Sequence, residues 1–167
     1  KNEDFAAGRN GGLDPDSDTW ALTLRHARDI GPFALSAELV KQWGRTRVVR
    51  NAVRPGPREE RDAWGGNAAA TLRLGEAEDA PYIRARYAYF GGDRGGSARV
   101  ESFDPFFYGF SDWGTWYLGD MTSYSLTNTN ARVAALEFGA SPVEQVKLRL
   151  LLYDFTLERK KIGRAHA

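Results

Sequence analysis

Basic side chains recur at every second position in several short stretches of this sequence. Arg84 and Arg86 are two residues apart, as are Lys147 and Arg149. Cationic groups attract anions, and the planar fork of arginine also binds carboxylates through two parallel hydrogen bonds. The pattern predicts an anion-binding surface that also includes Glu38, and its bases are Arg25, Arg73, Arg84, Arg86, Lys147 and Arg149.

The residues that catalysis would need are missing or scattered. The chain has no cysteine, which excludes a cysteine nucleophile and a thiolate metal site. Its two histidines, His26 and His166, are far apart in the sequence, which argues against a metal site or a serine hydrolase. The acid pair Glu59 and Glu60 lies in a charged stretch without an apolar pocket to give the two groups different roles. We expect no enzymatic activity, no bound metal and no cofactor.

A dense group of aromatic residues offers a different kind of chemistry. Aromatic faces pack against the C–H groups of sugars, so the group is a candidate sugar-stacking platform made of Phe103, Phe106, Tyr108, Trp113 and Trp116. The alternative is that these rings only anchor a loop against the rest of the protein.

Composition limits the classes of protein to consider. The 167 residues carry 23 Lys and Arg against 22 Asp and Glu, and this near-neutral balance argues against a nucleic-acid binder. Charges interrupt every long window, so no run of 18 apolar residues could form a membrane-spanning helix. A transmembrane β-barrel hides its apolar surface at alternate positions and fits the same composition. We expect residues 1–167 to be a single segment that is incomplete at both ends.

Alternation of apolar and polar residues is the dominant signal along the chain. Leu22, Leu35, Leu72 and Ile83 all lie in stretches where every second side chain is apolar. This period of two predicts β-strands with one apolar face and one polar face. The expected fold is all-β, a transmembrane antiparallel β-barrel present as a fragment of about six strands. These strands, roughly 9–11 residues long, are expected near residues 20–26, 33–43, 64–74, 81–91, 130–140 and 146–152.

The connections between these strands are predicted to alternate in length. Short turns are expected at residues 28–32, 75–80 and 141–145, and long external loops at residues 44–63 and 92–129. Tight turns at one end and long loops at the other are typical of outer-membrane barrels. Within the second loop we expect no crossing strand, with a short helix near residues 115–122. The alternative is a strand at residues 116–125, which would shift every later strand by one crossing.

Large aromatic residues give an independent test of this arrangement. Trp20, Trp43, Trp64 and Tyr89 all fall on the apolar face at the long-loop end of their strands. Amphipathic rings prefer the headgroup level of a bilayer, so this placement predicts a lipid-facing membrane girdle.

Several motifs in the second half of the chain resemble the alginate export family of Gram-negative outer-membrane β-barrels. They are Phe103-Asp-Pro-Phe-Phe-Tyr-Gly109, Trp113-Gly-Thr-Trp116, Gly119-Asp120, Asn128-Thr-Asn130 and Leu151-Leu-Tyr-Asp-Phe155. The resemblance implies a monomeric barrel, wider than this chain could close, with an electropositive pore for an anionic uronate polysaccharide. Family members carry an acid or amide near Leu118, so this chain departs from the pattern there.

Taken together, these patterns predict a passive channel in the outer membrane of a Gram-negative bacterium. Its partners would be the lipid bilayer and either an anionic polysaccharide or small anions, with no nucleic acid. One alternative is a general anion-preferring porin for small organic acids. Another is a soluble carbohydrate-binding β module that uses the aromatic group as its binding face.

Overall fold

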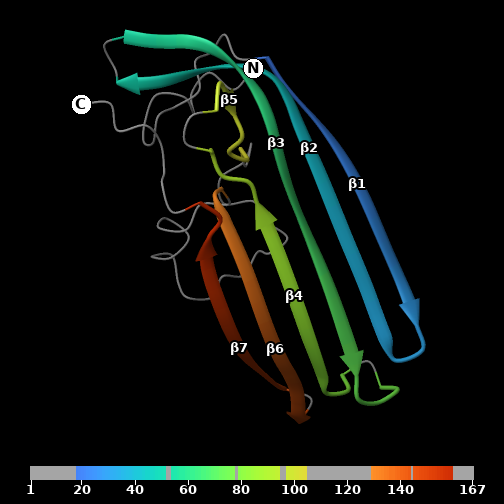
Figure 1. The fold of residues 1–167 in the computed structure, drawn as a ribbon. Coiled ribbons are helices and arrows are strands. Elements are labelled where there is room, and N and C mark those ends of the chain that lie inside the picture. Colours follow the sequence, from blue (N-terminus) through green and yellow to red (C-terminus); the bar gives the residue numbers. More distant parts are fainter. Residues whose placement is uncertain are drawn as a thin grey trace.

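The fold was derived from a computed structural model of the chain (Figure 1), which describes residues 18–51, 54–77, 79–94, 97–104, 129–143 and 145–159. These residues form one sheet of seven strands: β1 (Asp18–Ile30), β2 (Phe33–Asn51), β3 (Arg54–Arg73), β4 (Tyr82–Phe90), β5 (Arg99–Val100), β6 (Ala131–Val143) and β7 (Val146–Leu157). No helix among the described residues is long and apolar enough to cross a membrane.

The predicted all-β fold is confirmed. The six long strands follow the order β1-β2-β3-β4-β6-β7, each pair is antiparallel, and the sheet does not close on itself. Each overlaps one of the six predicted stretches. The short strand β5 pairs in parallel with β3, beside residues 60 and 61.

Strand register sorts the side chains into two faces, because directly opposed residues in an antiparallel pair point to the same side. One row of opposed residues crosses five strands and is apolar throughout: Phe33, Leu72, Ile83, Phe138 and Leu150. We call this side of the sheet the apolar face. A second row, on the other side, includes Thr71, Arg84 and Glu137, and we call that side the polar face.

Side chains on the apolar face are exposed over most of the sheet. Leu24 is 71% exposed, Leu22 64% and Leu150 58%. Leaving a leucine side chain in water rather than burying it forgoes roughly 2 kcal/mol, so a soluble protein would cover such a surface. In the described part of the chain no second layer of protein covers it. His26, Arg28 and Asp154 are polar exceptions on the two outermost strands, and Lys41, Asp62 and Arg132 are further exceptions nearer the other end of the sheet.

The strand connections separate the two ends of the sheet. β1 meets β2, β3 meets β4 and β6 meets β7 at the lower end in Figure 1, which we call the short-turn end. At the opposite end β4 ends and β6 begins, and we call it the long-loop end. β4 and β6 are antiparallel neighbours, as expected if no strand crosses between them. The alternative strand at residues 116–125, and the helix expected near 115–122, lie outside the described residues.

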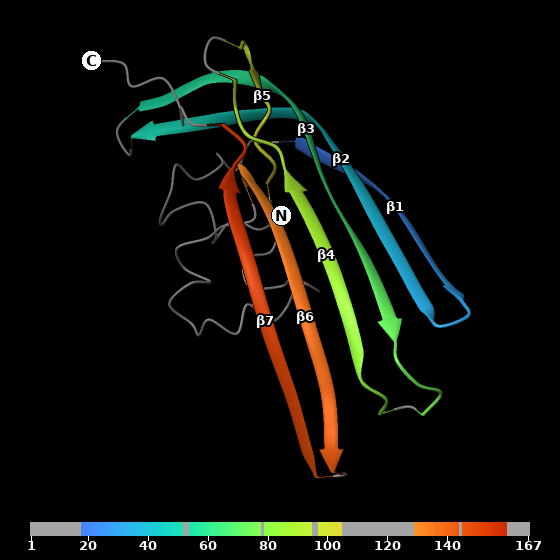
Figure 2. The same ribbon diagram turned by 60° about the horizontal axis from the view of Figure 1, so that its bottom comes forward.

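The prediction of a loop at residues 44–63 is wrong. β2 and β3 continue as a two-stranded ribbon to Asn51 and Arg54, so they are 19 and 20 residues long rather than 9–11. Figures 1 and 2 show both strands extending past their neighbours and bending at the long-loop end. Charged side chains indicated a loop, but here they face one another across the ribbon, as Arg45 does with Glu60. Polarity in this stretch marks where the apolar face ends, not where the strands end.

Two glycines with positive φ provide a test of the β1–β2 pairing. Gly31, at φ +55°, forms the turn, and a Cβ there would meet nothing within 4 Å. Gly44, at φ +136°, lies opposite Thr19, and a Cβ there would collide with the carbonyl oxygen of Asp18. We therefore expect Gly44→Ala to destabilise the full-length protein by about 3 kcal/mol or more, and Gly31→Ala by about 1 kcal/mol.

Urea unfolding of both variants in detergent micelles or lipid vesicles measures this difference. Equal midpoints for the two variants would contradict the close approach of β1 to β2 at Gly44.

Candidate functional site

The polar face brings the predicted anion-binding residues together. The register places all seven of them on this side of the sheet: Arg25, Glu38, Arg73, Arg84, Arg86, Lys147 and Arg149. Two acids accompany Glu38 on the described strands between Arg25 and the short-turn end, namely Glu137 and Asp29. The sequence analysis omitted Asp29 because it ended the first strand at His26. Six bases against three acids still leave this surface positively charged.

A single carboxylate joins two of these bases. Glu137 Oε2 lies 3.7 Å from Arg84 NH1, and Glu137 Oε1 lies 3.7 Å from Arg149 NH1. The Tyr82 hydroxyl also donates a hydrogen bond of 2.6 Å to Oε1. The cationic residues therefore differ in their surroundings, which strand phase alone cannot reveal.

Glu38, the acid in the predicted set, is also close to polar partners. Glu38 lies directly opposite Arg25 on β1 and opposite Asn67 on β3. The Asn67 side chain donates a hydrogen bond of 3.4 Å to Glu38. This part of the polar face is therefore a polar row that spans three strands.

Nearer the long-loop end, the polar face carries an apolar cluster that the sequence analysis missed. Ala88, Phe90 and Val133 are buried there, and Phe103, Tyr153 and Phe155 pack against them. The Phe103 ring lies 5.6 Å from the Phe90 ring and fills the space where a Cβ on Gly65 would be. The available signal was the change along the polar face of β4 from Arg84 and Arg86 to Ala88 and Phe90. Of the sugar-stacking candidates, only Phe103 is described; Phe106, Tyr108, Trp113 and Trp116 lie outside the described residues, as does Leu118.

Polar contacts fasten the same segment to the sheet. The Gln42 side chain, which is fully buried, donates to the Asp104 carbonyl at 2.6 Å and accepts from the Asp104 amide at 2.9 Å. Arg61 donates to the Ser102 carbonyl at 3.1 Å, and its side chain is only 3% exposed. We call these contacts, together with Phe103, the loop anchor. It holds the chain that follows β5 against the polar face.

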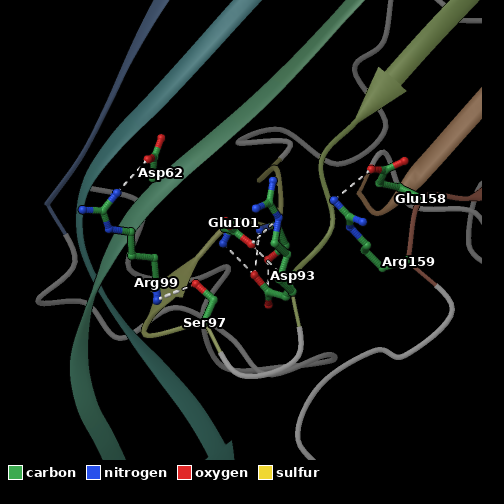
Figure 3. A network of polar contacts seen from close by, with 9 residues as sticks. Asp62, Asp93, Ser97, Arg99, Glu101, Glu158 and Arg159 are labelled. Atoms are coloured by element: carbon green, nitrogen blue, oxygen red, sulfur yellow. Dashed lines mark hydrogen bonds and ion pairs between the residues drawn. The ribbon is translucent and has the colours of Figure 1, made fainter.

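The segment before the anchor has a fixed structure of its own (Figure 3). The Asp93 carboxylate accepts hydrogen bonds from the Glu101 and Ser102 amides at 2.6 and 2.8 Å. Arg99 on β5 reaches back to β3, where it lies 3.2 Å from Asp62 and 3.5 Å from Glu60. Residues 97–102 therefore return to the edge of β3 rather than extending away from the sheet.

The carboxyl group of Asp104 lies in a partly buried part of the anchor. Burial raises the pKa of the Asp104 carboxyl above its ordinary value of 3.8, and the Arg61 guanidinium, 3.5 Å away, opposes part of that rise. An acid whose pKa is raised by folding binds more protons in the folded state. The stability of the protein therefore falls as pH rises from the unfolded-state pKa to the higher folded-state pKa. Below about pH 3.8 the Asp104 carboxyl is protonated in both the folded and the unfolded protein, so its raised pKa does not lower the stability there.

On the apolar face, the four predicted girdle residues lie toward the long-loop end. Trp20 is directly opposite Trp43, and Trp64 and Tyr89 lie on the same face of β3 and β4. Lys41 is a residue of this region that the sequence analysis missed. Its ammonium nitrogen lies 4.4 Å from the centre of the Trp64 ring and forms an ion pair with Asp62.

The loop anchor can be tested with one pair of variants. Gln42→Ala leaves the buried amide and carbonyl of Asp104 without this partner, at a cost of about 1–3 kcal/mol. We expect hydrogen exchange of the Asp104 amide to speed up roughly tenfold or more in the full-length protein. Asp104→Asn is the control, because it keeps both backbone hydrogen bonds and removes only the charge. It should leave exchange slow and reduce the loss of stability between acid and neutral pH.

Fast exchange in Asp104→Asn, or slow exchange in Gln42→Ala, would show that the hydrogen bonds between the Gln42 side chain and the Asp104 backbone do not hold the segment. An unchanged pH dependence in Asp104→Asn would contradict the raised pKa of Asp104.

Comparison with known proteins tests the resemblance seen in the motifs. The family model for alginate export matches residues 6–163, which is nearly the whole chain. No curated protein and no solved structure matches the chain significantly. The resemblance carried by the motifs around Phe103 and Leu151 is confirmed, and the chain belongs to the alginate export family.

Proposed function

We propose that this chain forms part of the wall of an outer-membrane channel for anionic solutes, with an anionic polyuronate polysaccharide as its cargo. The family match supports export of a polysaccharide at the level of the family. The observation that carries the proposal is the division of one sheet into an exposed apolar face and a positively charged polar face. The channel is passive, and its residues carry out no covalent chemistry.

The apolar face is the surface that contacts lipid in this proposal. Its leucines need an apolar environment, and hydrocarbon supplies one where no protein layer does. The aromatic residues Trp20, Trp43, Trp64 and Tyr89 then lie near the outer headgroups, at the end where the β2–β3 ribbon leaves the membrane. The proposed location is the outer membrane of a Gram-negative bacterium, in a barrel that functions as a monomer.

The polar face lines the conduit. Fixed positive charges along a water-filled pore raise the local concentration of anions and lower the barrier to their passage. Arg84, Arg149 and Glu137 together carry a net positive charge, because two guanidinium groups pair with one carboxylate. The loop anchor lies on this same face, so the segment around Phe103 narrows the conduit near its long-loop end.

Ion selectivity tests this proposal. Removing two charges with Arg84→Gln and Arg86→Gln should lower the anion-to-cation permeability ratio of the full-length protein. A unit charge a few Å from a permeating ion is worth about 1 kcal/mol in water, so we expect a decrease of roughly fivefold. Reversal potentials in a KCl gradient across planar bilayers measure the ratio. The matched control is Arg28→Gln with Arg45→Gln, which removes two exposed arginines from the apolar face and should leave the ratio unchanged.

A cation-selective channel, or equal effects of the two double variants, would contradict the assignment of the polar face to the pore. The full-length protein should also fractionate with outer membranes and change its gel mobility on heating. Purification as a monomer without detergent would favour the soluble module. A polyuronate should block the current of small anions at low concentration, whereas a porin for small organic acids would show weak block or none.

A further inference from the structure

Glu137 is an acid buried in the middle of a face where bases are in excess. Its side chain is only 4% exposed, and three residues from the two neighbouring strands contact it. Tyr82 and Arg84 come from β4, and Arg149 comes from β7. A buried carboxylate needs such partners, because an unpaired charge away from water is very costly.

The contacts fix both arginines relative to Glu137. Arg84 and Arg149 approach different oxygens of the carboxylate, each at 3.7 Å. Arg84 is restrained further, since its Nε donates a hydrogen bond of 2.9 Å to the Thr71 hydroxyl and its guanidinium carbon lies 5.4 Å from the centre of the Tyr82 ring.

Tyr82 is itself held in place by its neighbours. Its ring occupies the position that a Cβ on Gly139 would take, and its hydroxyl donates to Glu137 at 2.6 Å. The arrangement therefore uses four adjacent strands, with Thr71 on β3, Tyr82 and Arg84 on β4, Glu137 on β6 and Arg149 on β7.

Exposure differs sharply between the acid and its two arginines. The Arg84 and Arg149 side chains are 38% and 43% exposed, against 4% for Glu137. A solute that reaches this part of the polar face therefore meets the guanidinium groups and not the carboxylate behind them. Held in a fixed position, an arginine loses less conformational freedom when it binds a ligand.

We propose that Glu137 and Tyr82 are positioning residues, which hold Arg84 and Arg149 as a binding subsite for one carboxylate of a uronate chain. This inference rests on the proposed function and deepens it. Glu137 has two opposite effects in this arrangement. Its charge reduces the general preference for small anions, while its contacts strengthen the binding of a uronate.

Two measurements on the full-length protein in planar bilayers separate these effects. The reversal potential in a KCl gradient reports the charge of the pore, and block of the current by an oligomannuronate hexamer reports uronate binding. Glu137→Gln should increase the preference for chloride and raise the Kd for block about tenfold. If Glu137 acted only through its charge, Glu137→Gln would increase the preference for chloride and would also strengthen block by the hexamer.

Glu38→Gln is the matched control, since it removes one negative charge from the same face beside a different base. We expect it to increase the preference for chloride and to strengthen block by the hexamer. Tyr82→Phe is the second variant. It removes the hydroxyl that holds Glu137 without changing any charge, so the reversal potential should stay constant while the Kd for block rises severalfold.

The outcomes distinguish the inference from the function on which it rests. If Glu137→Gln strengthens block as Glu38→Gln does, or if Tyr82→Phe leaves block unchanged, the positioning role is wrong and the anion channel stands. If the unaltered protein is cation-selective or is not blocked by the hexamer, the proposed function fails, and the subsite fails with it.

Discussion

Antiparallel pairing assigns each side chain of this protein to one of two surfaces, and both surfaces depend on the same register. A shift of β4 by one residue against both β3 and β6 would move Arg84 into the row of Leu72 and Phe138 and expose Ile83 on the polar face. The cost of a charged residue among exposed apolar groups makes such a shift unfavourable. Register is thus maintained by the environment on each side as well as by the backbone hydrogen bonds.

Period-two alternation was sufficient to predict the six long strands and their faces. Trp20 and Trp43, predicted as aromatic residues on the apolar face at the long-loop end of their strands, lie directly opposite one another. Alternation failed at residues 44–63. Apolar and polar residues alternate along a strand only where one face of the sheet is kept away from water. The ribbon of β2 and β3 beyond Trp43 has charged residues on its apolar-face side, so it carries no such signal.

The site was predictable as a surface but not as a set of contacts. Strand phase placed Arg84 and Arg149 on one side of the sheet, and Glu137 has the same phase, since phase depends only on position within a strand. That the three meet depends on how β4, β6 and β7 align, which is a long-range property of the sheet. Gln42 was missed for the same reason, because its partner Asp104 is 62 residues away along the chain.

The placement of β5 also bears on how the protein avoids unwanted association. β3 continues past the last residue of β4, and an edge left uncovered there would offer backbone groups to a strand from another molecule. β5 pairs with Glu60 and Arg61 on that edge, and the Gly91 amide binds the carbonyl of Trp64. A charged residue, Arg99, occupies the added strand. Part of this rim is thereby closed to intermolecular sheet growth.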